Sequence, residues 1–288
     1  MRLALAGLGN MGSAIGERLL DAGYPLTVWN RSVEKTAALT ERGATRSEHV
    51  EDLLGDADVL LTMLADDEAL RAVAGSALRR ARPGTTLIDL STVSPEASME
   101  VAAVAENAGV AFLRAPVSGN PTVVRSGNLT LIVSGPEEPY ARAKPVLEAI
   151  GPTLYHVGAG EQARVVKLAL QIMIGGTAQL MAEALTLAEA GEVEPRTLLE
   201  VMANSAVGSP FVRYKMEPLL AGDYSATFTT EMMRKDIDLV EDFARERAVP
   251  LPLVTTLSAA VDEAMAAGYE DQDFMALYLS LRRRTQPE

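Results

Sequence analysis

A glycine-rich turn at the start of the chain joins a short apolar segment to a longer amphipathic one. The turn reads Gly7-Leu8-Gly9-Asn10-Met11-Gly12. Residues 2–6 before it are typical of a buried strand, and residues 13–20 after it are typical of a helix. In that setting Gly7 permits the tight turn, Gly9 lets backbone approach a pyrophosphate, and Gly12 lets the helix pack close to the strand. Because a helix N-terminus attracts phosphate, this turn is predicted to bind a dinucleotide.

An alternation of strands and helices continues from this turn to about residue 157. Further strands are predicted at residues 26–29, 59–64, 85–90, 110–113 and 129–133. Helices are predicted at residues 33–42 and 95–108, the second of them after Ser94, a favourable N-cap residue. Such alternation is typical of a parallel sheet with helices on both faces.

Beyond residue 160 the pattern is wholly helical. Helices are predicted at residues 161–190, 195–204, 230–247 and 253–267. The first is longer than an ordinary helix, which suggests an element that joins two domains. We therefore expect an α/β fold in which a Rossmann dinucleotide-binding domain occupies residues 1–160. An all-α domain for substrate binding and dimerisation is expected to follow at residues 161–288.

The composition limits the partners of the chain. Its 288 residues carry a net charge of −13, which argues against nucleic acid as the main partner. There is no cysteine, which excludes disulfides, thiolate nucleophiles and cysteine-based metal sites, and no metal site is predicted. The two histidines, His49 and His156, are expected in surface or loop positions.

The apolar stretch at residues 168–187 could belong to a membrane span or to a buried helix. Gln171, Gln179 and Glu183 interrupt it, so we expect a buried helix and no membrane partner. A helix of this kind usually needs a partner surface, so a homodimer or homotetramer is expected. Because no basic and apolar leader precedes the first strand, a cytoplasmic location is also expected.

The end of the second strand favours the phosphorylated form of the cofactor. An NAD-binding domain normally has an acidic residue about 20 positions past the glycines, which binds the ribose hydroxyl. Here the chain reads Asn30-Arg31-Ser32, and Lys35 follows one turn later. Arg31 can grip a ribose phosphate with its planar guanidinium, while Ser32 adds a hydroxyl and Lys35 a second charge. We therefore predict NADP(H) in preference to NAD(H), with Asn30 also in the cofactor site.

Several later segments complete a series of motifs. They are Met63-Leu64-Ala65-Asp66, Asp89-Leu90-Ser91-Thr92-Val93-Ser94-Pro95, Ala115-Pro116-Val117-Ser118-Gly119, Lys167, Phe228 with Lys235-Asp236, and residues 268–273. In this order, and together with the glycine-rich turn, they resemble the β-hydroxyacid dehydrogenase family over essentially the whole chain. The family includes 3-hydroxyisobutyrate dehydrogenases, tartronate semialdehyde reductases and glyoxylate/succinic semialdehyde reductases.

The resemblance implies reversible hydride transfer between a nicotinamide cofactor and a small aldehyde, keto acid or β-hydroxyacid. Lys167 is implied as the proton donor in the reduction, assisted by Gln171. Burial or a second cation would have to lower the pKa of Lys167 to roughly 7–8 for this role. Ser118 and Gly119 are implied to hold a substrate carboxylate.

The resemblance also implies cofactor contacts from Met63, Leu64 and Thr92, and from Lys235 in the helical domain. This chain departs from the family in its substrate loop, which continues with Asn120 and Pro121 where a second glycine is usual. We therefore count Asn120 among the substrate-binding residues.

Two further positions depart from the family. Gln171 stands where the family usually has asparagine, and it shares a helix face with Lys167. Arg114 replaces a usual aspartate and is expected at a domain surface. Since Asn120 and Gln171 both lie on the substrate side, the family's substrates are not transferred to this chain.

Two other functions stay open beside the reductase. Imine reductases resemble this architecture, but they usually lack the lysine and the segment that corresponds to residues 91–95. A dinucleotide-binding protein without enzymatic activity is the third interpretation, and only Gln171 in place of asparagine favours it. An assay of NADPH oxidation with aldehydes, keto acids and a cyclic imine would separate the three.

Overall fold

The computed structural model describes residues 1–285 and divides into two compact units, Met1–Lys167 and Leu168–Glu288. The sequence predicts the boundary after residue 160, whereas the units divide after Lys167. This point lies inside α8 (Gln162–Ala190), the long helix predicted to join the domains.

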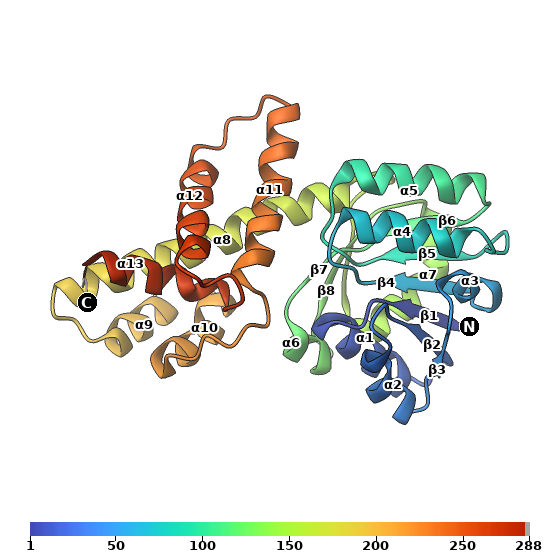
Figure 1. The fold of residues 1–288 in the computed structure, drawn as a ribbon, viewed down its shortest axis with the longest axis horizontal. Coiled ribbons are helices and arrows are strands. Elements are labelled where there is room, and N and C mark those ends of the chain that lie inside the picture. Colours follow the sequence, from blue (N-terminus) through green and yellow to red (C-terminus); the bar gives the residue numbers. More distant parts are fainter. Residues whose placement is uncertain (286–288) are drawn as a thin grey trace. The chain divides into compact units, whose positions relative to one another are not determined.

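A six-stranded parallel sheet forms the centre of the first unit (Figure 1). Its strands are β1 (Leu3–Ala6), β2 (Leu26–Trp29), β3 (Thr45–Arg46), β4 (Val59–Thr62), β5 (Thr86–Asp89) and β6 (Ala111–Arg114). They follow the order β3-β2-β1-β4-β5-β6, which is that of a Rossmann fold. The strands β1, β4 and β5 are buried throughout, as expected for a parallel sheet that helices cover on both faces. The predicted fold class is confirmed.

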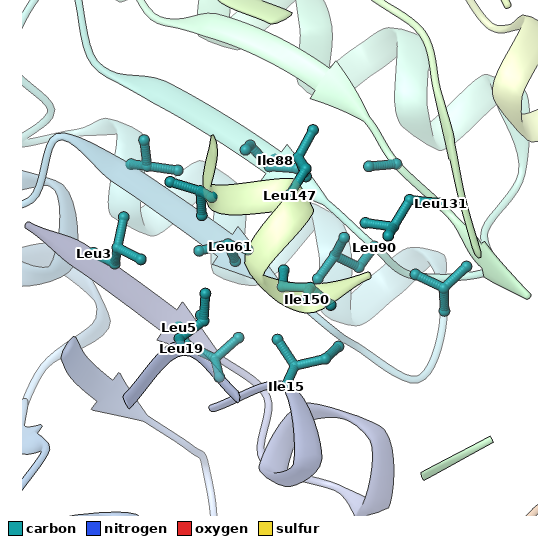
Figure 2. Packing of buried hydrophobic residues seen from close by; sticks show 14 of the residues in the cluster. Leu3, Leu5, Ile15, Leu19, Leu61, Ile88, Leu90, Leu131, Leu147 and Ile150 are labelled. Carbon is teal, nitrogen blue, oxygen red and sulfur yellow. The ribbon is translucent and has the colours of Figure 1, made fainter. Parts of the chain in front are cut away.

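Two apolar clusters cover the two faces of this sheet. On one face α1 (Asn10–Asp21) contributes Ile15 and Leu19, and α7 (Glu137–Ile150) contributes Leu147 and Ile150. Figure 2 shows these side chains gathered with leucines and isoleucines of β1, β4 and β5. On the other face lie α3 (Leu53–Asp56), α4 (Asp67–Leu78) and α5 (Pro95–Asn107). Burial on both faces holds the loops at the strand ends in fixed positions.

The predicted helix at residues 33–42 is broken into two short elements. The turn η1 (Val33–Thr36) is a 3-10 helix, and α2 (Ala37–Glu41) follows it. A second 3-10 turn, η2 (Val50–Asp52), precedes α3.

The last predicted strand does not join the parallel sheet, and this part of the prediction is wrong. The strands β7 (Val117–Ser118), β8 (Thr130–Val133) and β9 (Thr153–His156) form a separate sheet in that order. β8 runs antiparallel to β7 because the intervening segment holds only the five-residue α6 (Pro121–Arg125). A parallel return needs a crossover of a dozen or more residues, usually a full helix.

Helices make up the second unit as far as residue 285. After α8 come α9 (Pro195–Asn204), α10 (Pro210–Ala221), α11 (Thr230–Glu246), α12 (Pro252–Ala266), the short η3 (Phe274–Ala276) and α13 (Leu277–Thr285). Three of them begin with proline in the first turn, where its missing N–H costs nothing. Ser209 and Thr229 cap α10 and α11 by accepting a hydrogen bond from the third residue beyond.

The helix α8 is long and apolar enough to cross a membrane by length and composition alone. A core helix of a globular protein passes the same criteria. Ala178, Met181 and Leu185 of α8 lie in the buried cluster of the second unit, together with residues of α9, α11 and α12. One side of α8 therefore packs in the core of this unit, although only 33% of its most apolar 18-residue window is buried. The expected absence of a membrane partner stays a prediction.

A buried ion pair links α10 to the segment before η3. Both carboxylate oxygens of Asp273 lie 2.6 Å from Nζ of Lys215. The pKa of Lys215 is lowered, because the effect of burial is larger than the opposing effect of the Asp273 charge. Asp273 also accepts a hydrogen bond from the Met275 N–H. In this unit Asp273, the last residue of the 268–273 motif, therefore has a structural role.

Candidate active site

The loops that follow β1, β4 and β5 meet at one edge of the parallel sheet. A Cβ atom on Gly7 would lie only 2.2 Å from the Met63 carbonyl oxygen, so the first two loops touch. The Leu64 N–H donates a hydrogen bond of 2.8 Å to Ser91 Oγ, which joins the second loop to the third. Ligands of open α/β sheets bind at this carboxyl edge. The structure therefore brings the predicted residues Met63 and Leu64 to the glycine turn.

The glycine turn fits a dinucleotide. A Cβ on Gly12 would lie 1.9 Å from the Gly7 carbonyl oxygen, so Gly12 is required by the fold itself. A Cβ on Gly9 would meet nothing within 4 Å, and Gly9 has a φ of −71° that any residue adopts. The fold thus leaves space in front of Gly9. Gly9 is also the N-cap of α1 and provides no side-chain cap, so the first N–H groups of α1 remain available to a phosphate.

The other residues of the turn contribute backbone more than side chains. Leu8 is buried in the core cluster, and Met11 packs against the same cluster. Asn10 is exposed at the first position of α1. For Leu8 the predicted cofactor contact is therefore possible only through main-chain atoms.

The segment after β2 contains one residue that holds the glycine turn in place and two exposed cationic residues. Asn30 Oδ1 accepts a hydrogen bond of 2.8 Å from the Leu8 N–H, and Asn30 Nδ2 donates one of 3.0 Å to the Ser32 carbonyl. Asn30 therefore fastens the glycine turn to the end of β2. Arg31 and Lys35 are exposed and Ser32 is half-buried. These three side chains are available to a ribose phosphate at this end of the sheet.

A buried polar network, which the sequence does not reveal, lies beneath the β4 and β5 loops. Asp89 Oδ1 accepts hydrogen bonds from Thr62 Oγ1 at 2.6 Å and from Ser91 Oγ at 2.7 Å. Asp89 Oδ2 pairs with the guanidinium of Arg164, which also donates to the Ser91 carbonyl at 2.7 Å. The network ties the first turn of α8 to the loop that carries Thr92.

Lys167 follows Arg164 by three residues on α8 and is the last residue of the first unit. Its side chain is only 9% exposed, which excludes a simple surface lysine. Thr92 is half-buried in the loop after β5. Arg164 thus bonds the loop that carries Thr92 and lies one turn before Lys167 on the same helix. The roles of Lys167 and Thr92 as site residues stay predictions.

Asn120, predicted to bind the substrate, also caps a helix in the substrate loop, and its contact with the substrate stays a prediction. Asn120 Oδ1 accepts a hydrogen bond of 3.0 Å from the Val123 N–H and so caps α6. Asparagine followed by proline is typical of a helix start, and this signal is present in the sequence. Gly119 has a φ of +146°, and a Cβ there would lie 2.8 Å from Leu129. Ser118, at the end of β7, is half-buried.

Arg114 is not at a surface, so that expectation is wrong. Its side chain is buried and forms an ion pair with Glu161, just before α8 begins. Its guanidinium also lies 4.6 Å from the centre of the Phe112 ring. The opposite charge and the ring offset the cost of burying the arginine.

Two predicted residues belong to the second unit. Gln171 on α8 is 2% exposed and donates a hydrogen bond from Nε2 to Asp236 Oδ2 on α11. The Nζ of Lys235 lies 2.8 Å from Asp236 Oδ1. The predicted contact of Lys235 with the cofactor stays a prediction. Within residues 1–285 no group of three or more histidine, aspartate or glutamate side chains could hold a metal ion.

Profiles of known protein families match both units of the chain. The profile of the NAD-binding domain of 6-phosphogluconate dehydrogenase matches residues 2–158. The profile described as NAD-binding of NADP-dependent 3-hydroxyisobutyrate dehydrogenase matches residues 158–281. The chain belongs to the β-hydroxyacid dehydrogenase family. As a β-hydroxyacid dehydrogenase it is an oxidoreductase with an NAD(P)-binding Rossmann domain.

Individual relatives agree with this membership along the whole chain. An NAD-dependent L-serine dehydrogenase of Pseudomonas aeruginosa is 31% identical, with 95% of each chain covered. The crystal structure of a 3-hydroxyisobutyrate dehydrogenase from Salmonella typhimurium superposes with a TM-score of 0.90 at 27% identity, over 97% of this chain and 99% of that one. A structure of Psf3 with NADP+ has a TM-score of 0.89 at 26% identity, over 97% and 99%. The name of the serine dehydrogenase prints NAD, whereas the Psf3 structure is described as a complex with NADP+.

Proposed function

We propose that this β-hydroxyacid dehydrogenase is an NADPH-dependent reductase, reversible as a dehydrogenase, of a small aldehyde or keto acid that carries a carboxylate. The observation that carries the proposal is the buried Lys167 on the helix that Arg164 fastens to the carboxyl edge of the sheet. A buried ammonium close to the strand loops of a dinucleotide-binding edge is suited to proton transfer.

The preference for NADPH rests on the end of β2. Asn30 accepts a hydrogen bond from the Leu8 N–H, and the neighbouring Arg31 and Lys35 are exposed. A guanidinium and an ammonium there would favour a ribose phosphate, which an aspartate would repel. The NADP+ complex among the structural relatives supports the same preference. The serine dehydrogenase named NAD-dependent shows that the family also uses the other form.

The proposed mechanism divides the work between cofactor and protein. When bound, the nicotinamide supplies or accepts the hydride. Lys167 gives a proton to the carbonyl oxygen as negative charge develops there, and takes it back in the oxidation direction. Ser118 offers its hydroxyl and Gly119 its N–H to the substrate carboxylate. Asn120 acts on this loop by capping α6 and so fixes its course.

We also propose a homodimer or homotetramer. Met173, Leu180 and Leu187 are exposed on α8 and recur every seven residues. Apolar residues at this spacing form one seam along a helix, as in paired helices. Light scattering of the purified protein would test this, and a monomer that persists at high concentration would contradict it.

An assay of NADPH oxidation tests the proposed function. The panel contains glyoxylate, succinic semialdehyde, tartronate semialdehyde, a β-keto acid and a cyclic imine, each with NADPH and with NADH. We expect turnover with at least one carboxylated aldehyde or keto acid and a higher kcat/KM with NADPH. Turnover with the imine alone would replace the proposal by an imine reductase. Tight NADPH binding without any turnover would contradict both enzymes.

A further inference from the structure

The short helix α6 lies against α1, the helix that begins at the glycine turn (Figure 1). α6 has only five residues and starts directly after the substrate loop at residues 115–120. A helix of this length has little stability of its own, so its position depends on what it packs against. Val124 of α6 is fully buried in the cluster that contains Ile15 and Leu19 of α1. Apolar packing therefore holds α6 beside α1.

An ion pair joins the same two helices. Arg125, the last residue of α6, donates from Nε to Oε2 of Glu17 at 2.8 Å and from Nη2 to Oε1 at 3.3 Å. Two contacts of this kind fix the orientation of the partners as well as their distance. Arg42, after α2, lies 3.8 Å from Glu17 but pairs more closely with Asp21, at 2.6 Å. Arg125 is therefore the main partner of Glu17.

The turn that follows α6 also lies against α1. A Cβ on Gly127 would be 3.0 Å from Nη2 of Arg18, the residue after Glu17. The Gly127 N–H donates a hydrogen bond of 2.8 Å to the Val124 carbonyl, so this turn continues directly from α6. Adjacent side chains of α1 thus contact both the last residue of α6 and the turn beyond it.

The substrate loop is packed against α6 in turn. A Cβ on Gly119 would lie 3.1 Å from Cγ1 of Val123 on α6 and 2.8 Å from Leu129. A shift of α6 would therefore displace Gly119, whose N–H is proposed to bind the substrate carboxylate. The helix α1 thus carries the glycine turn at its start and supports the substrate loop through α6.

We propose that Glu17 and Arg125 are positioning residues that hold the substrate loop against α1 and thereby set the affinity for the substrate carboxylate. This inference rests on the proposed reductase function. Each residue acts through α6 on Gly119, and all of these residues belong to the first unit. The side chains of Glu17 and Arg125 are 23% and 51% exposed. Because exposed ion pairs contribute little to stability, the pair can be removed without loss of the fold.

Three variants test the pair, namely Arg125→Met, Glu17→Gln and the double variant. With saturating NADPH and the best carboxylated substrate of the panel, each single variant should raise KM about 3- to 5-fold. The loop binds the carboxylate equally in the ground state and the transition state, so kcat should stay within about twofold. The Kd for NADPH, measured by fluorescence titration, should stay unchanged. Since both substitutions break one contact, the double variant should match the single variants in KM.

A control variant with the same loss of charge is available on α7. Arg142 pairs with Glu138, and its side chain is 51% exposed, as is that of Arg125. Arg142→Met should leave KM unchanged, and an equal rise of KM in this variant would overturn the proposal. Arg125→Lys keeps the charge and should recover part of the lost affinity for the substrate.

The outcomes separate this inference from the function on which it rests. Unchanged KM in the single variants, or a double variant whose KM rises by the product of the two effects, would overturn the proposal while the reductase function stands. A fall in kcat at unchanged KM would indicate a merely structural pair and would overturn it as well. If Arg125→Met fails to fold, the KM of Glu17→Gln decides. Absence of turnover by the wild-type protein with the whole panel would overturn the reductase function and this inference with it.

Discussion

Arg164 and Asp89 form a buried ion pair that joins the first turn of α8 to the carboxyl end of β5. The two side chains are 1% and 0% exposed, and Arg164 also bonds the Ser91 carbonyl and Ser98 Oγ. Lys167 follows one turn later on the same helix. The proposed proton donor is thus held by a contact between residues 75 positions apart in the chain.

Loss of the arginine should destabilise the first unit. Arg164→Met leaves the Asp89 carboxylate buried without its cation, and we expect the free energy of unfolding to fall by about 3–5 kcal/mol. Urea denaturation followed by circular dichroism measures it. Arg80→Met is the matched control, because Arg80 pairs with Asp52 at 2.6 Å on the surface. It should cost less than about 1 kcal/mol. Equal losses in the two variants would contradict a special role for the buried pair.

The two glycines of the turn should respond differently to an added methyl group. Gly9→Ala places its Cβ in open space, so the thermal unfolding temperature of the free protein should stay unchanged. The same methyl group would obstruct a pyrophosphate, and we expect the Kd for NADPH to rise about 10-fold or more. Gly12→Ala meets the Gly7 carbonyl oxygen and should destabilise the free protein. Unchanged NADPH affinity in Gly9→Ala, measured by fluorescence titration, would place the cofactor elsewhere.

Removal of the guanidinium after β2 should change cofactor choice. Arg31→Ala loses a charge-assisted hydrogen bond to the ribose phosphate, so KM for NADPH should rise roughly 10- to 100-fold. KM for NADH should change little, since that cofactor has no phosphate at this position. Arg142→Ala, at an exposed site on α7, is the control with the same charge change. A parallel rise for both cofactors in Arg31→Ala would contradict the assignment.

The second unit should lose stability in alkali through Tyr224, a partly buried tyrosine. Burial raises the pKa of Tyr224 from 10.0 to about 12. Between these values the unfolded chain loses the phenol proton and the folded chain keeps it. The stabilisation is therefore complete below pH 10 and decreases as the pH rises towards about 12. Tyr224→Phe should show a shallower decrease of unfolding free energy over this range. An identical pH dependence in both proteins would contradict the expected shift.

Much of the fold is predictable because local signals agree with one another. Ser94 caps α5 as expected, and α9 begins at Pro195 and ends at Asn204, as predicted. The sequence pattern missed α7, since Pro145 inside it is unfavourable for a helix. The packing of Leu147 and Ile150 against the sheet outweighs that local preference.

The polar contacts of the site are harder to predict than its motifs. The GxGxxG turn and Lys167 follow patterns in the sequence, but nothing near Arg164 indicates that its charge is buried against Asp89. The sequence also predicts Arg114 wrongly at a surface, because its ion-pair partner Glu161 lies 47 residues further on. The Asn120 cap, by contrast, could have been predicted from the proline that follows it.

The most direct test of the account is the kinetics of Lys167→Met with NADPH and the best aldehyde or keto acid of the panel. The variant keeps the length of the side chain and removes its proton. We predict a fall in kcat of about 100-fold or more, with the Kd for NADPH unchanged. A variant that retains most of the wild-type kcat would contradict Lys167 as the proton donor and with it the proposed reductase mechanism.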